Sequence, residues 1–206
     1  LVYNTDQLDP SKMPNTLQGL TNPKWKGKIG WAPTNGSFQS MVTAMRVIWG
    51  EQETKTWLQA IQANEPLMYP KNTPQVAAAA EGEILIGLVN HYYLHRFLSE
   101  EGGAFSARNH HLEGAGPGSL VMVAGGGILS TAKNSENAES FFKFMLSKVA
   151  QQYFAEQTYE YPLIEGIKIN RILTPMEEIN KPVIDMAELE DISGTQTMLR
   201  DLGILE

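Results

Sequence analysis

The fold of this chain is decided by the stretch Glu83-Ile84-Leu85-Ile86-Gly87-Leu88-Val89-Asn90-His91-Tyr92-Tyr93. Its first seven residues are almost wholly apolar, as is typical of a strand that is covered on both faces of a parallel sheet. The residues after Asn90 show the periodicity of a helix, with Tyr93, Leu94 and Phe97 on its apolar side. Two phenols at such a strand-to-helix junction can both point into one cleft.

The alternation of strands and helices extends along the chain. Strands are expected over residues 1–3, 28–31 and 119–124, and residues 102–118 are expected to be loop-rich. Helices are expected over residues 38–48, 51–63, 73–81, 135–146 and 148–158, and helical pieces within residues 171–206. This pattern predicts an α/β class with a mainly parallel sheet.

Composition excludes several function classes. The 206 residues are enough for one large domain or two small ones. The net charge of −7 argues against binding of nucleic acid, which needs clustered Lys and Arg. No apolar run reaches the roughly 18 residues of a membrane-spanning helix, so we expect no direct membrane insertion. Because the chain has no cysteine, disulfides, thiolate metal sites and cysteine nucleophiles are excluded.

Tyr92 and Tyr93 have two possible roles. Neighbouring tyrosines are often half-buried packing residues. They can also be hard oxygen ligands, although ionising a phenol at neutral pH costs about 4 kcal/mol because its ordinary pKa is near 10. A trivalent cation lowers the pKa of any group that it coordinates, whereas zinc and magnesium rarely recruit phenolate. If the pair binds a metal, it favours Fe³⁺ over Zn²⁺ or Ca²⁺.

The histidines are less informative. His91 and His95 have the i, i+4 spacing of two zinc ligands on one helix face. The zinc-protease motif needs Glu directly after the first His, but Tyr92 stands there, and no third ligand has a familiar spacing. We therefore favour surface histidines near the mouth of a cleft. His110 and His111 are expected to be solvated.

Polar residues also stand at three expected helix starts. In the loop Pro33-Thr34-Asn35-Gly36-Ser37, free backbone N–H groups and the helix dipole favour an anion, although Ser37 can instead be only the N-cap. The segment Lys71-Asn72-Thr73-Pro74 repeats this arrangement, and Asn90 precedes the third helix. Together these helix starts suit a small anion beside a metal. Gly125-Gly126-Gly127 matches no dinucleotide fingerprint, and the chain has neither a P-loop nor a nucleophile elbow.

These segments together resemble a known family, the ferric-iron-binding periplasmic proteins of bacterial iron ABC transporters, also called bacterial transferrins. The resemblance runs over the whole chain. It rests on Leu1-Val2-Tyr3-Asn4, Asn22-Pro23-Lys24-Trp25-Lys26-Gly27-Lys28-Ile29-Gly30, Pro33-Thr34-Asn35-Gly36-Ser37-Phe38, Lys71-Asn72, Asn90-His91-Tyr92-Tyr93 and Glu160-Tyr161-Pro162-Leu163. The tandem tyrosine is its most specific element.

The resemblance implies a type II periplasmic-binding-protein fold, in which two α/β lobes with mainly parallel mixed sheets close over a ligand. This chain would be the C-terminal two-thirds. Residues 1–118 would form most of the C-terminal lobe, residues 119–164 would cross into the N-terminal lobe, and residues 165–206 would return. We expect most of the N-terminal lobe, with its own iron ligands, to lie upstream, because Leu1-Val2-Tyr3 reads as the end of a strand without an initiator Met.

The resemblance also implies the site residues. Tyr92 and Tyr93 match the paired iron-ligating phenolates, and Tyr3 stands where some members place a further tyrosine ligand. The loop Asn35-Gly36-Ser37 matches the segment that holds a synergistic anion, phosphate or carbonate, although it departs from the commoner Ser-Gly-Ala. Asn72 and Asn90 match further anion contacts.

The implied function is binding of ferric iron in the periplasm and its delivery to an ABC-type permease, not enzymatic catalysis. In a Gram-positive source the protein would be lipid-anchored outside the cytoplasm. One alternative keeps the fold and changes the cargo to a polyamine, thiamine, a phosphonate or another oxyanion. A less favoured alternative is a zinc-dependent enzyme that uses His91 and His95. The apolar surface of residues 119–129 is expected to pair with the missing N-terminal lobe.

Overall fold

The computed structural model describes residues 1–206, which divide into two compact units. The first unit comprises residues 1–121 and 179–206, and the second comprises residues 122–178. The assignment of residues 1–118, 119–164 and 165–206 to lobes stays a prediction, because the units are defined only by contacts within this chain.

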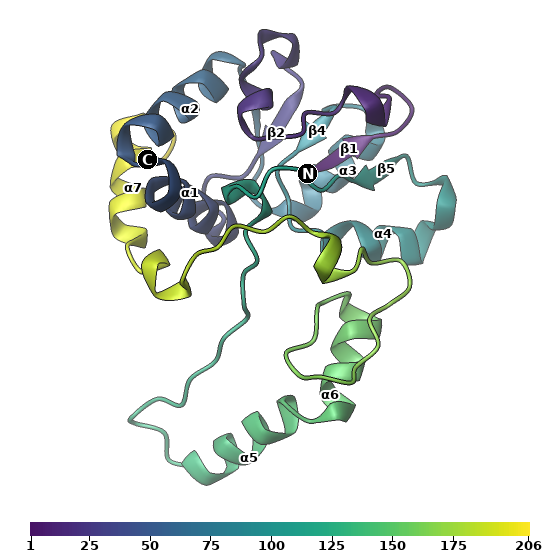
Figure 1. Ribbon diagram of the computed structural model, residues 1–206, viewed down its shortest axis with the longest axis vertical. Coiled ribbons are helices and arrows are strands. Elements are labelled where there is room, and N and C mark those ends of the chain that lie inside the picture. The colour runs from purple at the N-terminus through teal and green to yellow at the C-terminus, as the bar shows by residue number, and fades with distance from the viewer. The chain divides into compact units, whose positions relative to one another are not determined.

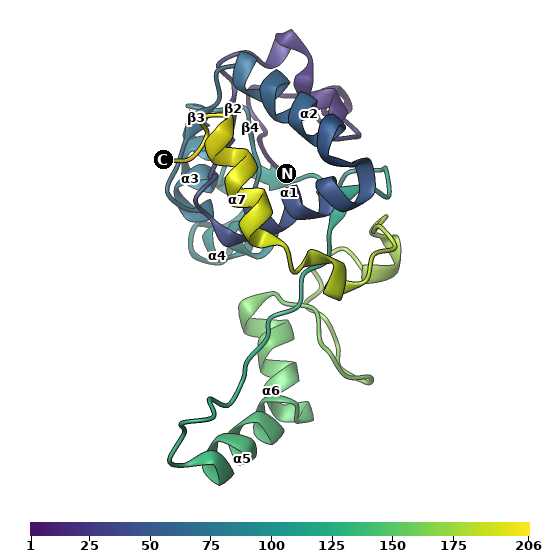
Figure 2. The same cartoon turned by 90° about the vertical axis from the view of Figure 1, so that its left-hand side faces the viewer.

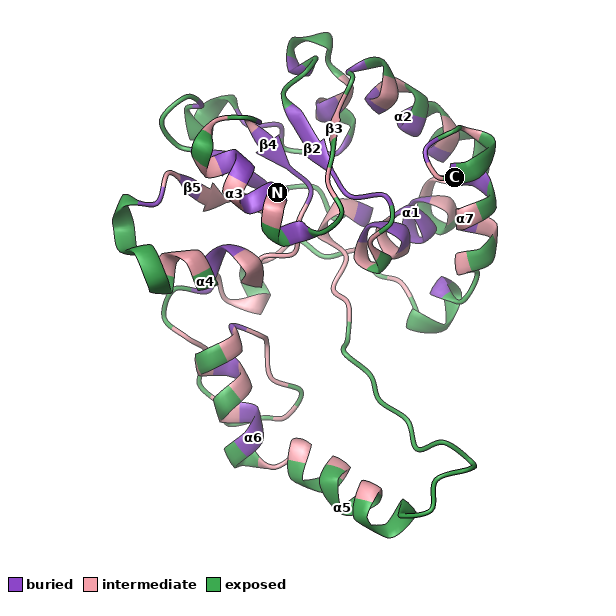
Figure 3. Ribbon diagram, turned by 180° about the vertical axis from the view of Figure 1, so that it is seen from behind, coloured by how far each residue is buried: buried purple, intermediate pink, exposed green.

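The first unit is built on a five-stranded mixed sheet in the order β3-β2-β4-β1-β5 (Figure 1; β3 is labelled beside β2 in Figure 3). The strands are β1 (Val2–Asn4), β2 (Ile29–Trp31), β3 (Leu67–Met68), β4 (Ile86–Gly87) and β5 (Ala107–Asn109). β2 pairs in parallel with both β3 and β4, and β1 is antiparallel to both β4 and β5. It follows that β2, β3, β4 and β5 all run in the same direction. The predicted α/β class is confirmed.

Helices of the first unit pack around the sheet. They are α1 (Gly36–Trp49), α2 (Glu51–Ala63), α3 (Asn72–Glu81), α4 (Tyr92–Glu101) and α7 (Ile192–Asp201). Of these, α1, α3 and α4 directly follow the parallel strands β2, β3 and β4. The expected helix over residues 51–63 is confirmed with the same ends. Gly82 ends α3 in the left-handed region at φ 79°, a conformation that glycine adopts without a steric penalty.

Two apolar clusters form the core of this unit. The larger one joins α1, α2 and α7 to the sheet and includes Val42, Met45, Leu58, Ile61 and Leu199. The smaller one lies around α3 and α4 and includes Val2, Val76, Ala79, Ile84 and Leu94. The buried residues concentrate in β2, β4 and the inner sides of these helices (Figure 3). This core fixes the strand ends, where the candidate site residues stand.

The second unit is small and helical, with α5 (Ser135–Met145), α6 (Lys148–Tyr153) and a π-helical turn over residues 154–158. The amide of Gln152 binds the following loop in both directions, donating to the Lys168 carbonyl at 2.9 Å and accepting from the Lys168 N–H at 3.2 Å. α5 buries none of its residues, and Phe141 and Phe144 are 58% and 54% exposed. Much of this unit's apolar surface is therefore uncovered.

Two sequence predictions about strands were wrong. Residues 119–124 do not form a strand: Pro117–Ser119 is a 3₁₀ turn, and residues 120–129 are irregular. An apolar run becomes a strand only when a neighbouring strand takes up its N–H and C=O groups, and no strand of this chain pairs with these residues. Conversely, residues 107–109 lie in the predicted loop but form β5, because β1 pairs with them.

No helix in the chain is both long and apolar enough to cross a membrane.

Candidate functional site

Three polar segments meet at one edge of the first unit's sheet. β2 leads to Asn35, β3 leads to Asn72, and β4 leads to Asn90 and the tyrosine pair. Because these strands are parallel and adjacent, their carboxyl ends lie at the same edge, and each connection opens a helix there. Open α/β sheets bind ligands at this edge. The topology therefore brings together the predicted segments that are far apart in the sequence.

The start of α1 is organised by Asn35. Its Oδ1 accepts hydrogen bonds from the Ser37 N–H at 2.8 Å and from the Ser37 hydroxyl at 2.6 Å. Asn35 is therefore the N-cap, and the alternative that Ser37 caps the helix was wrong. Gly36 is exposed, and a Cβ placed on it would meet no atom within 4 Å. The backbone at this helix start is open to a ligand.

Asn72 joins the second helix start to the first. It is the first residue of α3, and only 3% of it is exposed. Its Nδ2 lies 3.5 Å from the Ser37 Oγ, at the outer limit of a hydrogen bond. Asn35, Ser37 and Asn72 therefore form one connected polar group made from two helix starts.

The tyrosine pair stands in the first turn of α4. The rings of Tyr92 and Tyr93 lie 4.6 Å apart between centroids, tilted by 36°. Asn90 donates from Nδ2 to the Tyr92 Oη at 2.9 Å. Tyr93 is half-buried and packs against the smaller core cluster. Packing and ligand binding are thus compatible here. Tyr93 is held by the apolar core, and the phenol oxygen of Tyr92 accepts a hydrogen bond from Asn90.

Tyr3 is placed differently. It is 7% exposed and belongs to the larger core cluster, whereas Tyr93 packs against the smaller one. Its ring meets that of His110 edge to face, with centroids 6.5 Å apart. In this structure Tyr3 is a core side chain at the level of Ile86 in the sheet.

The histidines are buried more deeply than the sequence predicted. His95 is only 7% exposed, so its assignment as a surface histidine was wrong, and burial lowers its pKa to about 4, with smaller contributions from His91 and His111. His111 is half-buried, and burial, with the amino terminus and nearby histidines, lowers its pKa to about 4. The expectation that His110 and His111 are solvated was also wrong: β5 ends at the edge where α4 begins, and burial lowers the pKa of His110 as well.

Amide side chains brace the three segments, a feature that sequence reasoning missed. Gln39 donates to the Pro33 carbonyl at 3.0 Å, Gln75 to the Leu88 carbonyl at 3.2 Å, and Asn109 to the His91 carbonyl at 2.9 Å. Gln39 and Gln75 are buried in the first turn and a half of α1 and α3. A buried amide just inside a helix start was the available sequence signal.

The donor set limits the chemistry. No group of three or more His, Cys, Asp or Glu side chains that could hold a metal ion occurs in residues 1–206. A metal at this edge would take phenol oxygens and a bound anion, which are hard ligands. The zinc-enzyme alternative gains no support from this geometry.

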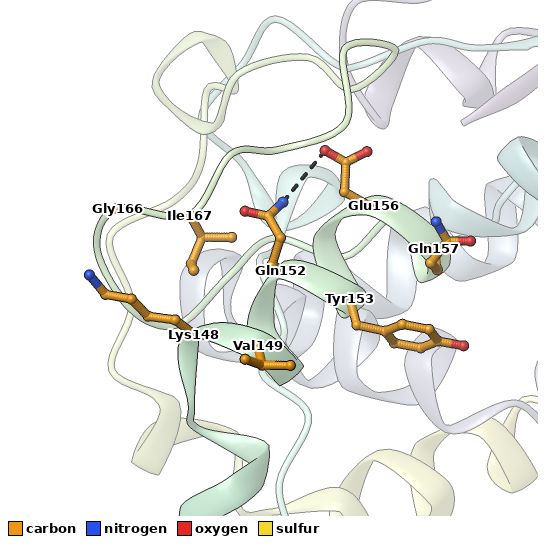
Figure 4. Close-up of a pocket in the computed structure, with 8 residues that line it drawn as sticks. All are labelled: Lys148, Val149, Gln152, Tyr153, Glu156, Gln157, Gly166 and Ile167. Carbon is orange, nitrogen blue, oxygen red and sulfur yellow. Dashed lines mark hydrogen bonds between the residues drawn. The ribbon is translucent and has the colours of Figure 1, made fainter.

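A separate open hollow of about 540 Å³ lies in the second unit, between α6 and residues 166–167. Figure 4 shows its lining, where Gln152 contacts Glu156 at 3.5 Å and the Tyr153 ring projects away from Ile167. None of the predicted site residues lines it. It shares no residue with the edge described above.

Comparison with known proteins gives consistent matches. Residues 1–186 match the family described as bacterial extracellular solute-binding protein. The chain is 29% identical over 206 residues to the Fe(3+)-binding periplasmic protein of Serratia marcescens, covering 99% of this chain and 60% of that protein. It is 30% identical over 198 residues to iron uptake protein A1 of Synechocystis sp., covering 92% of this chain and 54% of that protein.

Solved structures also match this chain over nearly its whole length. Iron-bound HitA from Pseudomonas aeruginosa matches with a TM-score of 0.92 at 32% identity, over 98% of this chain and 65% of that one. Trichodesmium IdiA (FutA), in complex with iron and citrate, matches with a TM-score of 0.83 at 26% identity, over 99% of this chain and 67% of that one. The chain spans about 60% of the length of the first curated relatives that it matches.

Proposed function

Because this chain belongs to the bacterial extracellular solute-binding protein family, we propose that it binds ferric iron as cargo, with Tyr92 and Tyr93 as tyrosinate ligands. The family consists of binding proteins, so the expectation of a non-enzyme is confirmed, as is the type II periplasmic-binding fold. Iron is named in the relatives and neighbours at 26–32% identity. The observation that carries the proposal is the pair of phenol rings 4.6 Å apart at the start of α4.

The chemistry of a phenol explains why the cargo would be trivalent. Ionising two free phenols at neutral pH costs about 8 kcal/mol in total, because neutral pH lies about three units below the ordinary pKa of each phenol. A ferric ion offsets that cost by direct coordination, because it becomes the largest charge in the site. Asn90 assists, since its N–H group stabilises an oxyanion at the Tyr92 Oη more strongly than a neutral phenol.

Tyr3 is proposed as a third phenol ligand, but unlike Tyr92 and Tyr93 it does not stand at the start of α4. Its ring lies in the larger core cluster, so coordination would require it to turn toward the sheet edge. Replacing Tyr3 by Phe is therefore expected to change ferric affinity less than replacing Tyr92.

We also propose a synergistic anion, phosphate or carbonate, at the joined starts of α1 and α3. Asn35, Gly36, Ser37 and Asn72 would hold it, using the open backbone at Gly36 and the polar group around Ser37. Helix N-termini attract anions through their free N–H groups and the helix dipole. Asn90, at the third helix start, would contact either the anion or the tyrosinate. The Trichodesmium structure, which holds citrate as well as iron, supports the proposal of an anion.

The setting proposed for this function is outside the cytoplasm: the periplasm, or a lipid-anchored position in a Gram-positive source. Delivery of the iron would be to an ABC-type permease. The second unit would contribute to the N-terminal lobe, whose remainder would correspond to the length of the relatives that this chain does not cover. The exposed Phe141 and Phe144 support this assignment, because apolar side chains of that kind are normally covered.

Another small solute, such as a polyamine, thiamine or a phosphonate, is the alternative cargo. Titration calorimetry of the chain with ferric citrate, spermidine, thiamine and methylphosphonate separates these candidates. We expect heat of binding with ferric citrate and none with the three organic solutes. Saturable binding of an organic solute, with no ferric uptake, would overturn the proposal.

A further inference from the structure

The loop that precedes α1 is bound by a buried side chain, that of Gln39. Its backbone N–H donates to the Asn35 carbonyl at 3.1 Å, and its Nε2 donates to the Pro33 carbonyl at 3.0 Å. Gln39 is 7% exposed, so losing these hydrogen bonds would leave buried polar groups without a partner, which costs free energy. Gln39 thus ties the first turn of α1 to residues 33–35, which lead into the proposed anion ligands.

The Gln39 amide is held between the loop and α7. Gln196 donates from Nε2 to the Gln39 Oε1 at 3.0 Å, across 157 positions of sequence. Since the Pro33 carbonyl can only accept, the nitrogen of Gln39 must face Pro33, and its oxygen must face Gln196. The two bonds are therefore coupled, because reversing the Gln39 amide breaks its bond to Pro33 and removes the acceptor that faces the Gln196 donor.

A second path from α7 reaches the backbone of the same residue. Thr43 donates its hydroxyl hydrogen to the Gln39 carbonyl at 2.9 Å, so its oxygen accepts from Thr195 at 2.7 Å. Thr195 in turn accepts from Arg46 at 3.0 Å, and both threonines are fully buried. α1 and α7 lie side by side in both views of the fold (Figures 1 and 2).

We propose that Gln39 and Gln196 are positioning residues for the anion-binding loop, and that α7 fixes the geometry of that loop through them. The inference rests on the proposed function of residues 35–37. It assigns a role to α7, which stands some 155 positions further along the chain than the loop. Disturbing the Gln196 contact should therefore alter the loop, while the pairing of the sheet is kept.

The test uses Gln196→Glu, which has the same shape but replaces the donor by an acceptor. The carboxylate repels the Gln39 oxygen and favours a reversed amide, which then turns its oxygen toward the Pro33 carbonyl. The matched control is Gln62→Met, because Gln62 donates to the Leu202 carbonyl at 3.0 Å, ties α2 to the end of α7, and does not touch Gln39. Gln196→Met removes the donor without adding charge, and it replaces Gln196→Glu if that variant fails to fold.

The first measurement is amide hydrogen exchange of residues 35–39, which needs no ligand. Loss of one buried neutral hydrogen bond corresponds to about a fivefold increase in exchange. We expect that increase in Gln196→Glu and none in Gln62→Met. Unchanged exchange in Gln196→Glu, or the same increase in both variants, overturns the inference.

The second measurement is the affinity of the ferric-loaded chain for inorganic phosphate. We expect Gln196→Glu to weaken it about fivefold, and Gln62→Met to leave it unchanged. Equal phosphate affinity in the unaltered chain and in Gln196→Glu contradicts the positioning role. If the unaltered chain takes up no phosphate, the proposed anion site fails instead, and the exchange measurement alone decides whether α7 positions the loop.

Discussion

Removing the side-chain amide of Asn90 is expected to weaken ferric binding by one to two orders of magnitude. Its Nδ2 lies 2.9 Å from the Tyr92 Oη, so it donates a hydrogen bond to the oxygen that would coordinate iron as a phenolate. Hydrogen bonds to charged groups contribute about 1.5–3 kcal/mol. At about 1.4 kcal/mol for each factor of ten, Asn90→Ala should raise the ferric dissociation constant about 10- to 100-fold. Asn90→Asp should be worse, because a carboxylate beside a phenolate adds like-charge repulsion.

The assay is competition for ferric iron between the protein and citrate at fixed pH. Asn15→Ala is the matched control: it also removes an asparagine side-chain bond, to the Glu113 carboxylate at 2.7 Å, but away from the tyrosines. The control should bind iron like the unaltered chain. An Asn90→Ala variant whose affinity stays within about twofold of the unaltered chain would refute the role of this donor.

Three further predictions concern stability. Asn35→Ala should lower the free energy of unfolding by about 1 kcal/mol through loss of the N-cap, whereas Ser37→Ala should change it little; urea denaturation compares the two, and an equal loss would contradict the cap assignment. Arg46→Met should cost about 1–3 kcal/mol in the same assay, because the guanidinium bonds Glu51, Asp191 and Thr195, and no measurable cost would show that water replaces these contacts. Stability should also fall as the pH drops from 6.5 toward 4, because the lowered pKa values of His95 and His111 mean that the unfolded chain binds more protons there. The free energy of unfolding should fall by about 1–2 kcal/mol for each ring after solvent screening. His95→Gln should flatten this dependence of stability on pH. An unchanged slope of stability against pH in that variant would contradict the role of His95.

The α/β class could be predicted from the sequence because the patterns that indicate helices and strands are local. The helix over residues 51–63 has an apolar periodicity and a glycine before it, and both its ends were predicted correctly. The continuous apolar run before Asn90 is also a local signal, and it predicts a strand, although only Ile86 and Gly87 form β4. Periodicity predicts which face is buried, and burial of that face is what stabilises a helix or strand.

Features that depend on distant partners could not be predicted. Residues 107–109 form a strand only because β1, about a hundred positions earlier, offers them hydrogen bonds. Residues 119–124 are as apolar as a strand but lack such a partner. In the site, Asn35 and Ser37 are equally good cap residues by type, and only the backbone geometry decides between them.

The histidines illustrate the same limit for electrostatics. His91 and His95 are adjacent by helical spacing, and their rings lie 6.1 Å apart. His111 joins them through the end of β5, a strand that the sequence did not predict, and its charge affects the pKa of His95. The burial that lowers these pKa values follows from the sheet order, which no spacing of residues reveals.

The central claim is that Tyr92 and Tyr93 coordinate ferric iron as phenolates. Its most direct test is the visible spectrum during titration with ferric citrate, compared between the unaltered chain and the Tyr92→Phe, Tyr93→Phe double variant. Tyr153→Phe is the control, since Tyr153 is 59% exposed on α6 in the second unit. We predict a red phenolate-to-iron charge-transfer band in the unaltered chain and the control, and a strongly weakened band in the double variant, which keeps only Tyr3 of the three proposed phenol ligands. A colourless titration of the unaltered chain, or an undiminished band in the double variant, would contradict the claim.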